Sequence, residues 1–142
     1  KRPLTIEAPR ILLVEDNVIN QLVATNALES EGYQVDVANN GLEALDMLKS
    51  RKLEAQYSAI IMDCQMPGRD GYSATRGIRD GEAGEENKDK LIVAMTANAM
   101  KGDREICLSS GMDDYLKKPL EENDVKNILT KWSQKDMLNT LH

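Results

Sequence analysis

The chain has 142 residues, of which 41% are hydrophobic and 30% charged, and its formal net charge is −6. A domain of this length buries roughly 70% of its unfolded surface, so no disulfide or structural metal is needed for folding. The acidic balance argues against nonspecific nucleic-acid binding, and no run approaches the ~20 apolar residues of a membrane helix. Because no signal-peptide pattern is present, we expect a cytoplasmic domain without direct membrane contact, within a parent protein that can itself be membrane-anchored.

Residues 1–9 hold two prolines without periodicity and are predicted to be a linker. The chain begins with Lys1 rather than methionine, which is consistent with a fragment cut from a longer protein. Apolar runs then alternate with segments of helical periodicity. We expect strands at 11–14, 35–37, 59–62, 91–95 and 115–116, each followed by a helix.

Helix ends and loops fit the same alternation. Gly32 and Gly111 are placed to end two helices, and the charged stretch 80–90 is predicted to be a solvated loop. The last helix carries an apolar stripe at Val125, Ile128, Leu129 and Trp132. We therefore predict one α/β domain over 10–133, with a parallel sheet covered by helices on both faces, and a C-terminal tail over 134–142.

Polar side chains follow four of the predicted strands. Glu15 and Asp16 end the first strand and Asp63 the third, whereas Thr96 and Lys118 follow the fourth and the last. If the strand order is 2-1-3-4-5, the topological switch lies between the first and third strands, and ligands bind at the carboxyl ends there. The sequence thus predicts a site that gathers three acids, a hydroxyl and a lysine.

These groups suit phosphoryl transfer. Three neighbouring carboxylates repel one another unless a cation is present, and Mg²⁺, with Mn²⁺ as an alternative, prefers such hard oxygen ligands. Lys118 and Thr96 supply a positive charge and a hydroxyl for the oxygens of a transferring phosphoryl group. Asp63, in the centre, is then the nucleophile that forms an aspartyl-phosphate.

The segments that carry a family likeness are Val14-Glu15-Asp16-Asn17 with Asn20, Met62-Asp63 with Met66-Pro67, Asp70-Gly71, Thr96-Ala97, and Tyr115 through Lys118-Pro119. In combination they resemble the response-regulator receiver domains of two-component and phosphorelay signalling, most closely those fused to hybrid sensor histidine kinases. The resemblance implies a flavodoxin-like (βα)5 fold, a doubly wound parallel sheet of five strands in the order 2-1-3-4-5.

The same resemblance assigns roles to the site residues. Asp63 would accept the phosphoryl group and Lys118 would pair with it. Glu15, Asp16, Asp63 and the backbone carbonyl of Gln65 would hold Mg²⁺. Glu15 stands where the family often has Asp, so its side chain is expected to reach the metal through water.

Two further features follow from the resemblance. Thr96 and Tyr115 would form the switch pair that reports phosphorylation, although the residues alone leave open a helix cap for Thr96 and a packing role for Tyr115. The Lys118-Pro119 peptide bond would be cis.

Partners are also implied by the family. The phosphoryl donor or acceptor would be a histidine kinase domain or a histidine phosphotransfer domain, docked on Asn20, Ile19, Leu22, Val23 and Arg69. We expect a monomer that binds no nucleic acid, with dimerisation through the fourth and fifth strand–helix units as the alternative. His142, the only histidine, lies at the C-terminus, so the phosphohistidine must belong to another domain or protein.

Several alternatives compete with a competent receiver. A stand-alone or output-linked regulator has the same residues and stays open. A haloacid-dehalogenase-like phosphatase requires an acid two positions after its nucleophile, where this chain has Gln65. An inactive pseudo-receiver would lack a site residue, and a flavin-binding domain would need a phosphate-cradling loop where Glu15 and Asp16 stand.

Cys64 and Cys107 lack metal-ligand spacing and are predicted to be buried free thiols in a reducing compartment.

Overall fold

The computed structural model describes residues 10–50, 57–64, 71–96 and 101–141, and the side chains of all these except 101–104 and 132–141. Along the chain the elements are β1 (Arg10–Val14), α1 (Val18–Ser30), β2 (Gln34–Ala38), α2 (Gly41–Ser50), β3 (Ala59–Asp63), α3 (Gly71–Asp80), the 3-10 helix η2 (Glu85–Asn87), β4 (Leu91–Thr96), α4 (Lys101–Ser109), β5 (Asp114–Lys117) and α5 (Glu122–Leu141). The predicted alternation of strands and helices is confirmed.

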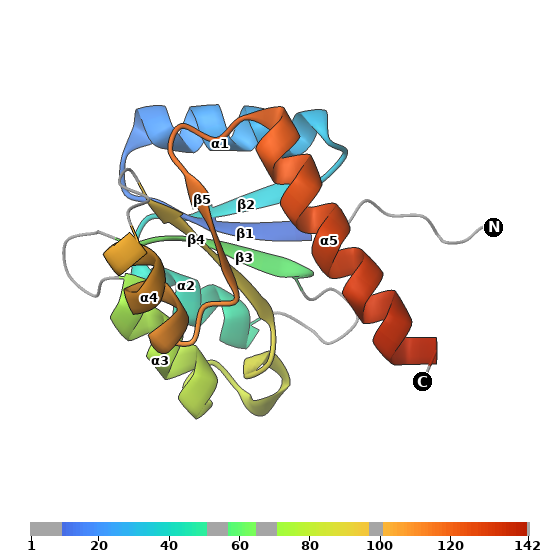
Figure 1. The fold of residues 1–142 in the computed structure, drawn as a ribbon. Helices are drawn as coiled ribbons and strands as arrows, with labels where there is room; N and C mark the ends of the chain where they lie inside the picture. The colour runs from blue at the N-terminus through green and yellow to red at the C-terminus, as the bar shows by residue number, and fades with distance from the viewer. Residues whose placement is uncertain (1–9, 51–56, 65–70, 97–100, 142) are drawn as a thin grey trace.

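The five strands form one parallel sheet in the order β2-β1-β3-β4-β5 (Figure 1). The chain leaves β1 for β2 on one side and then crosses to β3 on the other, so the direction of winding reverses between β1 and β3. This is the predicted doubly wound order, and it places the topological switch beside Asp63.

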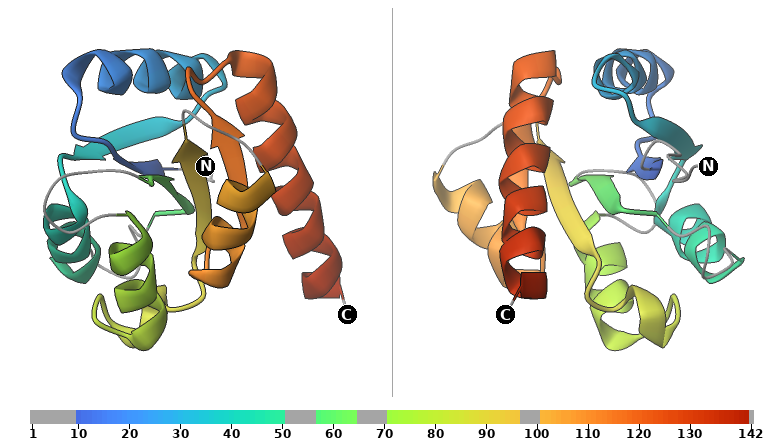
Figure 2. Two further views of the ribbon diagram at one scale, coloured as in Figure 1. Left: turned by 60° about the vertical axis from the view of Figure 1, so that its left-hand side comes forward. Right: turned by 90° about the vertical axis from the view of Figure 1, so that its right-hand side faces the viewer.

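Helices cover both faces of the sheet, α1 and α5 on one side and α2, α3 and α4 on the other (Figure 2). Alternation along the buried strands explains the two layers, because successive side chains point to opposite faces. The residues Leu12, Val14, Ile60, Met62 and Ile92 pack toward α2, α3 and α4. The residues Ile11, Leu13, Ile61 and Val93 pack toward α1 and α5.

The charged stretch 80–90 is solvated at most of its charged side chains, as its composition predicts, but it is more ordered than a loop. It contains η2, and Ala83 and Asn87 within it are buried. The Asn87 side-chain amide donates to the carbonyls of Leu48, 3.3 Å away, and Ala83, 2.9 Å away. These bonds satisfy a buried polar group and fasten the segment to the end of α2.

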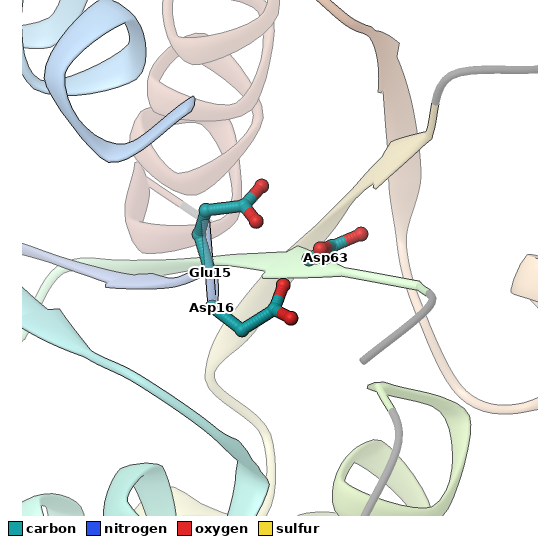
Figure 3. A group of neighbouring side chains, drawn as sticks. All are labelled: Glu15, Asp16 and Asp63. Carbon is teal, nitrogen blue, oxygen red and sulfur yellow. The ribbon is translucent and has the colours of Figure 1, made fainter. Parts of the chain in front are cut away.

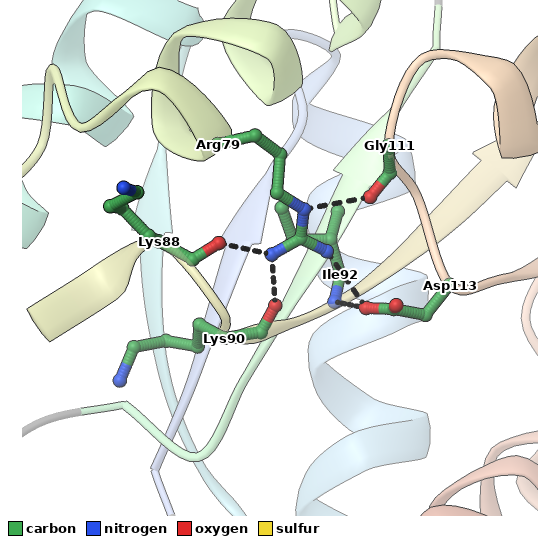
Figure 4. Close-up of polar contacts among 6 residues, drawn as sticks. All are labelled: Arg79, Lys88, Lys90, Ile92, Gly111 and Asp113. Atoms are coloured by element: carbon green, nitrogen blue, oxygen red, sulfur yellow. Dashed lines mark hydrogen bonds and ion pairs between the residues drawn. The ribbon is translucent and has the colours of Figure 1, made fainter. Parts of the chain in front are cut away.

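Arg79, at the end of α3, holds the C-terminal end of the segment 80–90 (Figure 4). Its guanidinium donates to the carbonyls of Lys88, Lys90 and Gly111 at 2.7, 2.8 and 2.9 Å. It also pairs at 2.9 Å with Asp113, whose carboxylate accepts the amide of Ile92. One side chain thus joins α3, the segment 80–90, the start of β4 and the turn before β5.

Two other boundaries bear on the predictions. The Lys118-Pro119 peptide bond is cis, as the family resemblance implies. Helix α5 continues to Leu141, through the segment 134–141 that was predicted to be a tail, and no glycine or proline interrupts it. None of the helices in the described residues has the length and apolar character needed to cross a bilayer.

Candidate functional site

Three carboxylates meet where β1 and β3 end (Figure 3). Strand register produces the meeting: Val14 lies opposite Met62, so Glu15 and Asp16 follow β1 beside Asp63 at the end of β3. One oxygen from each of the three acids lies within 4.8 Å of the others. Glu15 and Asp63 are buried and Asp16 is exposed, so the cluster opens to solvent on the Asp16 side.

Lys118 supplies the positive charge predicted for this cluster. Its ammonium lies 3.0 Å from a carboxylate oxygen of Glu15 and 3.0 Å from one of Asp63. Burial acts to lower the pKa of Lys118, but the bonds and charges of the two carboxylates outweigh it, so the pKa is raised above its ordinary value. Lys118 therefore stays cationic at neutral pH.

The charge of the cluster defines what it can hold. Three carboxylates share one ammonium, so these four side chains are formally dianionic. Carboxylate oxygens with a net charge of −2 suit a hard divalent cation such as Mg²⁺. One of the carboxylates is exposed, so a cation can reach the cluster from solvent. Asp16 is the accessible carboxylate of the three, whereas Glu15 is buried against Lys118.

Local hydrogen bonds hold the acid-bearing turn after β1. The second carboxylate oxygen of Glu15 accepts the backbone N–H of Asn17 at 3.0 Å, and the Asn17 side chain caps α1 by accepting the N–H of Asn20. Gln21 was not singled out in the sequence, yet its side chain donates to the Glu15 carbonyl at 2.7 Å and to Asn39 at 2.9 Å. The only sequence signal for this bonding role of Gln21 was a polar side chain between apolar residues of the predicted helix.

The nucleophile candidate is fixed by a close backbone approach. Gly71 begins α3 with its Cα against the end of β3, where an added Cβ would lie 2.1 Å from the backbone oxygen of Asp63 and 3.1 Å from the Cα of Cys64. Real Cβ atoms essentially never lie as close to another atom as 2.1 Å, so the contact with the Asp63 oxygen excludes a Cβ unless the backbone moves. Glycine is therefore required here by space rather than by turn conformation.

We predict that Gly71→Ala lowers the free energy of unfolding by about 1–3 kcal/mol, because the methyl group overpacks this contact. It should also weaken Mg²⁺ binding, because the Asp63 backbone must shift. Denaturant unfolding and calorimetric Mg²⁺ titration measure the two effects.

Gly32→Ala is the matched control for this prediction. Its φ of +92° makes alanine strained by about 1–2 kcal/mol, but no atom lies within 4 Å of the added Cβ. The control should lose stability while keeping wild-type Mg²⁺ affinity. Wild-type stability and affinity in Gly71→Ala would contradict the steric account.

The remaining predicted site residues are spread around the cluster. Thr96 is buried at the end of β4, one position beyond the residue paired with Asp63, and its carbonyl accepts the N–H of Lys118 at 2.8 Å. Tyr115 is half-buried on β5 and packs on the α2–α3–α4 side. Gln65 and Arg69 lie outside the described residues.

The predicted partner surface lies on α1. The side chains of Ile19 and Leu22 are 70% and 61% exposed, and Val23 is also exposed at 38%. Asn20 and Val23 border a small depression that Lys118, Pro119 and Leu120 complete. An exposed apolar strip thus runs along α1 beside the site, as predicted.

Comparison with known proteins agrees with this fold and identifies its family. The family model of the response regulator receiver domain matches residues 11–130, and the chain belongs to this family. Sensor protein GacS of Pseudomonas syringae pv. syringae is 41% identical over 132 residues, which are 92% of this chain and 14% of that protein. The chain therefore spans a small part of such relatives.

Two solved structures are similar over most of the chain. One is the receiver domain of sensor histidine kinase PA1611 from Pseudomonas aeruginosa PAO1, with magnesium in its active-site cleft; it is 46% identical, with a TM-score of 0.76, over 88% of this chain and 97% of that one. The other is the Saccharomyces cerevisiae complex of the histidine phosphotransfer protein Ypd1 with the receiver domain of Ssk1. The matched chain of that complex is 33% identical, with a TM-score of 0.74, over 89% of this chain and 89% of its own length.

Proposed function

We propose that this domain takes a phosphoryl group from a phosphohistidine onto Asp63 in a Mg²⁺-dependent reaction, and passes it on within a phosphorelay. The observation that carries the proposal is the buried Asp63 carboxylate, held at 3.0 Å by Lys118 within a dianionic cluster. An Asp63 oxygen forms the new bond to phosphorus as the phosphorus–nitrogen bond of the donor histidine breaks.

The chain's own residues explain how the added charge is tolerated. Mg²⁺, when bound, neutralises oxygens of the phosphoryl group and of the acids. Asp16, Asp63 and the Gln65 carbonyl would hold it, with Glu15 reaching it through water. Lys118 stays cationic and pairs with the phosphoryl oxygens, and the Thr96 hydroxyl donates to one of them. In this proposal, Thr96 and Tyr115 then report the modified state.

A small phosphodonor tests the proposal without a partner protein. Incubation with acetyl phosphate and Mg²⁺ should add one phosphoryl group to the intact mass, and a chelator should prevent it. Hydroxylamine should remove the group, as expected of an acyl phosphate. A chain that gains no phosphoryl group at saturating Mg²⁺ would contradict the proposed function.

Mg²⁺ should also stabilise the fold, because it binds the native cluster and relieves the repulsion between its acids. At a hundredfold excess over the dissociation constant, the gain is about 2.7 kcal/mol. We expect Asp16→Asn to raise the metal-free melting temperature and to remove the Mg²⁺-dependent rise. Asp46→Asn, at an 80%-exposed side chain on α2, should retain the wild-type response. Identical melts of the wild type with and without Mg²⁺ would count against a metal site.

The parent protein is proposed to be a hybrid sensor histidine kinase. The support is the likeness to GacS and to the receiver of PA1611, although a stand-alone or output-linked regulator would share these site residues. We propose that the domain is a monomer before and after phosphorylation, which sedimentation velocity with and without a phosphodonor tests.

The partner surface is proposed to be the apolar strip of α1 formed by Val18, Ile19, Leu22 and Val23, with Asn20 and Arg69 at its rim. Exposed apolar side chains at positions 18, 19, 22 and 23 lie on neighbouring turns of one helix beside the site, which suits a helical partner that carries a phosphohistidine. The likeness to the receiver in the complex with Ypd1 supports this class of partner.

The double variant Ile19→Gln/Leu22→Gln is expected to slow phosphoryl transfer from a phosphorylated histidine phosphotransfer protein about tenfold or more, because it removes apolar docking contacts. Its reaction with acetyl phosphate should be unchanged, since the acids are untouched. Leu42→Gln, at a 59%-exposed residue of α2, is the control. Undiminished transfer in the double variant would exclude α1 as the docking surface.

A further inference from the structure

Two free thiols touch inside the molecule next to the proposed phosphorylation site. Cys64 directly follows Asp63, and Cys107 lies in α4. Their sulfurs are 3.6 Å apart, and each residue is only 1% exposed. The two residues are 43 positions apart in sequence, so the contact joins distant segments.

The backbone of Cys64 is held in place by neighbouring strands and helices. Its N–H donates to the carbonyl of Met95 on β4 at 3.1 Å, and Gly71 of α3 lies against its Cα. A disulfide needs a sulfur–sulfur distance near 2.05 Å, so the pair must close by about 1.5 Å. Closing the bond therefore requires rotation of the two side chains and a shift of α4 toward β3.

We propose that Cys64 and Cys107 are a redox modification site, at which hydrogen peroxide closes a reversible disulfide that fixes α4 to the end of β3. One sulfur attacks the peroxide, which breaks the oxygen–oxygen bond and gives a sulfenic acid and water. The second sulfur displaces the sulfenic oxygen as a second water. The two thiols lose two protons and two electrons, and the peroxide is reduced to two waters.

The surroundings of Cys64 set the pace of this reaction. Burial, followed by the neighbouring Cys107, raises the pKa of the Cys64 thiol to about 12. Because the thiolate is the reactive form, this sulfur reacts slowly at neutral pH. Both residues are also only 1% exposed, so we expect oxidation by hydrogen peroxide to be slow and follow it over hours.

The bond would act on the segment that leads from the site. Helix α4 begins five residues after Thr96. In the proposed function, the Thr96 hydroxyl donates a hydrogen bond to the phosphoryl group. Tying Cys107 to the residue beside Asp63 restrains this helix. Formation of the bond does not itself depend on phosphorylation, so Asp63→Asn should form it as the wild type does.

The experiment treats the reduced full chain with hydrogen peroxide and measures free thiols and intact mass under denaturing, non-reducing conditions. We expect a monomer that has lost two hydrogen atoms and both alkylatable thiols, and that recovers them with dithiothreitol. The oxidised protein should unfold at a higher denaturant concentration, because the bond constrains the unfolded chain.

Cys64→Ser and Cys107→Ser should each form no disulfide within the chain and show no shift in unfolding midpoint after treatment. The wild-type mass decides the matter even if a variant fails to fold. Two thiols that remain alkylatable after hours, a disulfide only between chains, or oxygen added to a single cysteine would each overturn the proposal.

Discussion

Replacing Asp63 with asparagine should reduce phosphoryl incorporation roughly a thousandfold or more, as removal of the nucleophile does in enzymes that form covalent intermediates. The amide has nearly the same shape as the carboxylate but is not a nucleophile. Because Asp63 is 2% exposed and lies 3.0 Å from Lys118, the variant keeps its packing while losing one charge of the cluster. The measurement is intact mass after incubation with acetyl phosphate and Mg²⁺.

Asp46→Asn is again the control, because it makes the same chemical change at an exposed position on α2. It should accept a phosphoryl group at the wild-type rate. Circular dichroism and melting of Asp63→Asn separate loss of the nucleophile from loss of the fold. A folded Asp63→Asn protein that gains hydroxylamine-labile phosphate as the wild type does would exclude Asp63 as the acceptor.

Arg79→Ala should lower the free energy of unfolding by about 2–4 kcal/mol, because it removes several hydrogen bonds of one charged group and leaves their acceptors without it. The guanidinium contacts the carbonyls of Lys88, Lys90 and Gly111 and the carboxylate of Asp113 (Figure 4). These partners lie in segments that are far apart in sequence. Urea unfolding followed by circular dichroism gives the change.

Arg76→Ala, at an exposed arginine of the same helix, is the matched control and should change stability by less than about 0.5 kcal/mol. Arg79→Lys should recover only part of the loss, since an ammonium cannot reproduce the planar fork of donors. Equal stabilities of Arg79→Ala and Arg76→Ala would show that the observed bonds contribute little.

The acidic residues at the strand ends could be predicted from sequence, because each directly follows a short apolar run. An apolar run followed by Asp63, and another followed by Glu15, each mark a buried strand with an acid at its tip. Parallel pairing then brings the tips to one edge whatever the details of packing. The order β2-β1-β3-β4-β5 and the role of Lys118 opposite Asp63 were expected from the family resemblance rather than from these patterns, and the structure shows both the order and a 3.0 Å contact between Lys118 and Asp63.

Other features depend on contacts that no local pattern encodes. Arg79 looks like an ordinary charged residue at a helix end, because its partners are 9 to 34 positions away. Asn87 lies in a charged stretch, yet its amide is buried against Leu48. Glu15 was expected to serve the metal, whereas the structure also shows it as the partner of Lys118. Only the folded chain brings these groups together.

The central claim is that Asp63 carries the phosphoryl group. Its most direct test is reductive trapping: the phosphorylated chain is treated with borohydride, which converts an aspartyl-phosphate to homoserine, and its peptides are sequenced by mass spectrometry. If Asp63 carries the phosphoryl group, homoserine is expected at position 63 and its formation should depend on Mg²⁺ and on the phosphodonor. Homoserine at another aspartate, or a phosphoryl group that resists the reduction, would contradict this assignment.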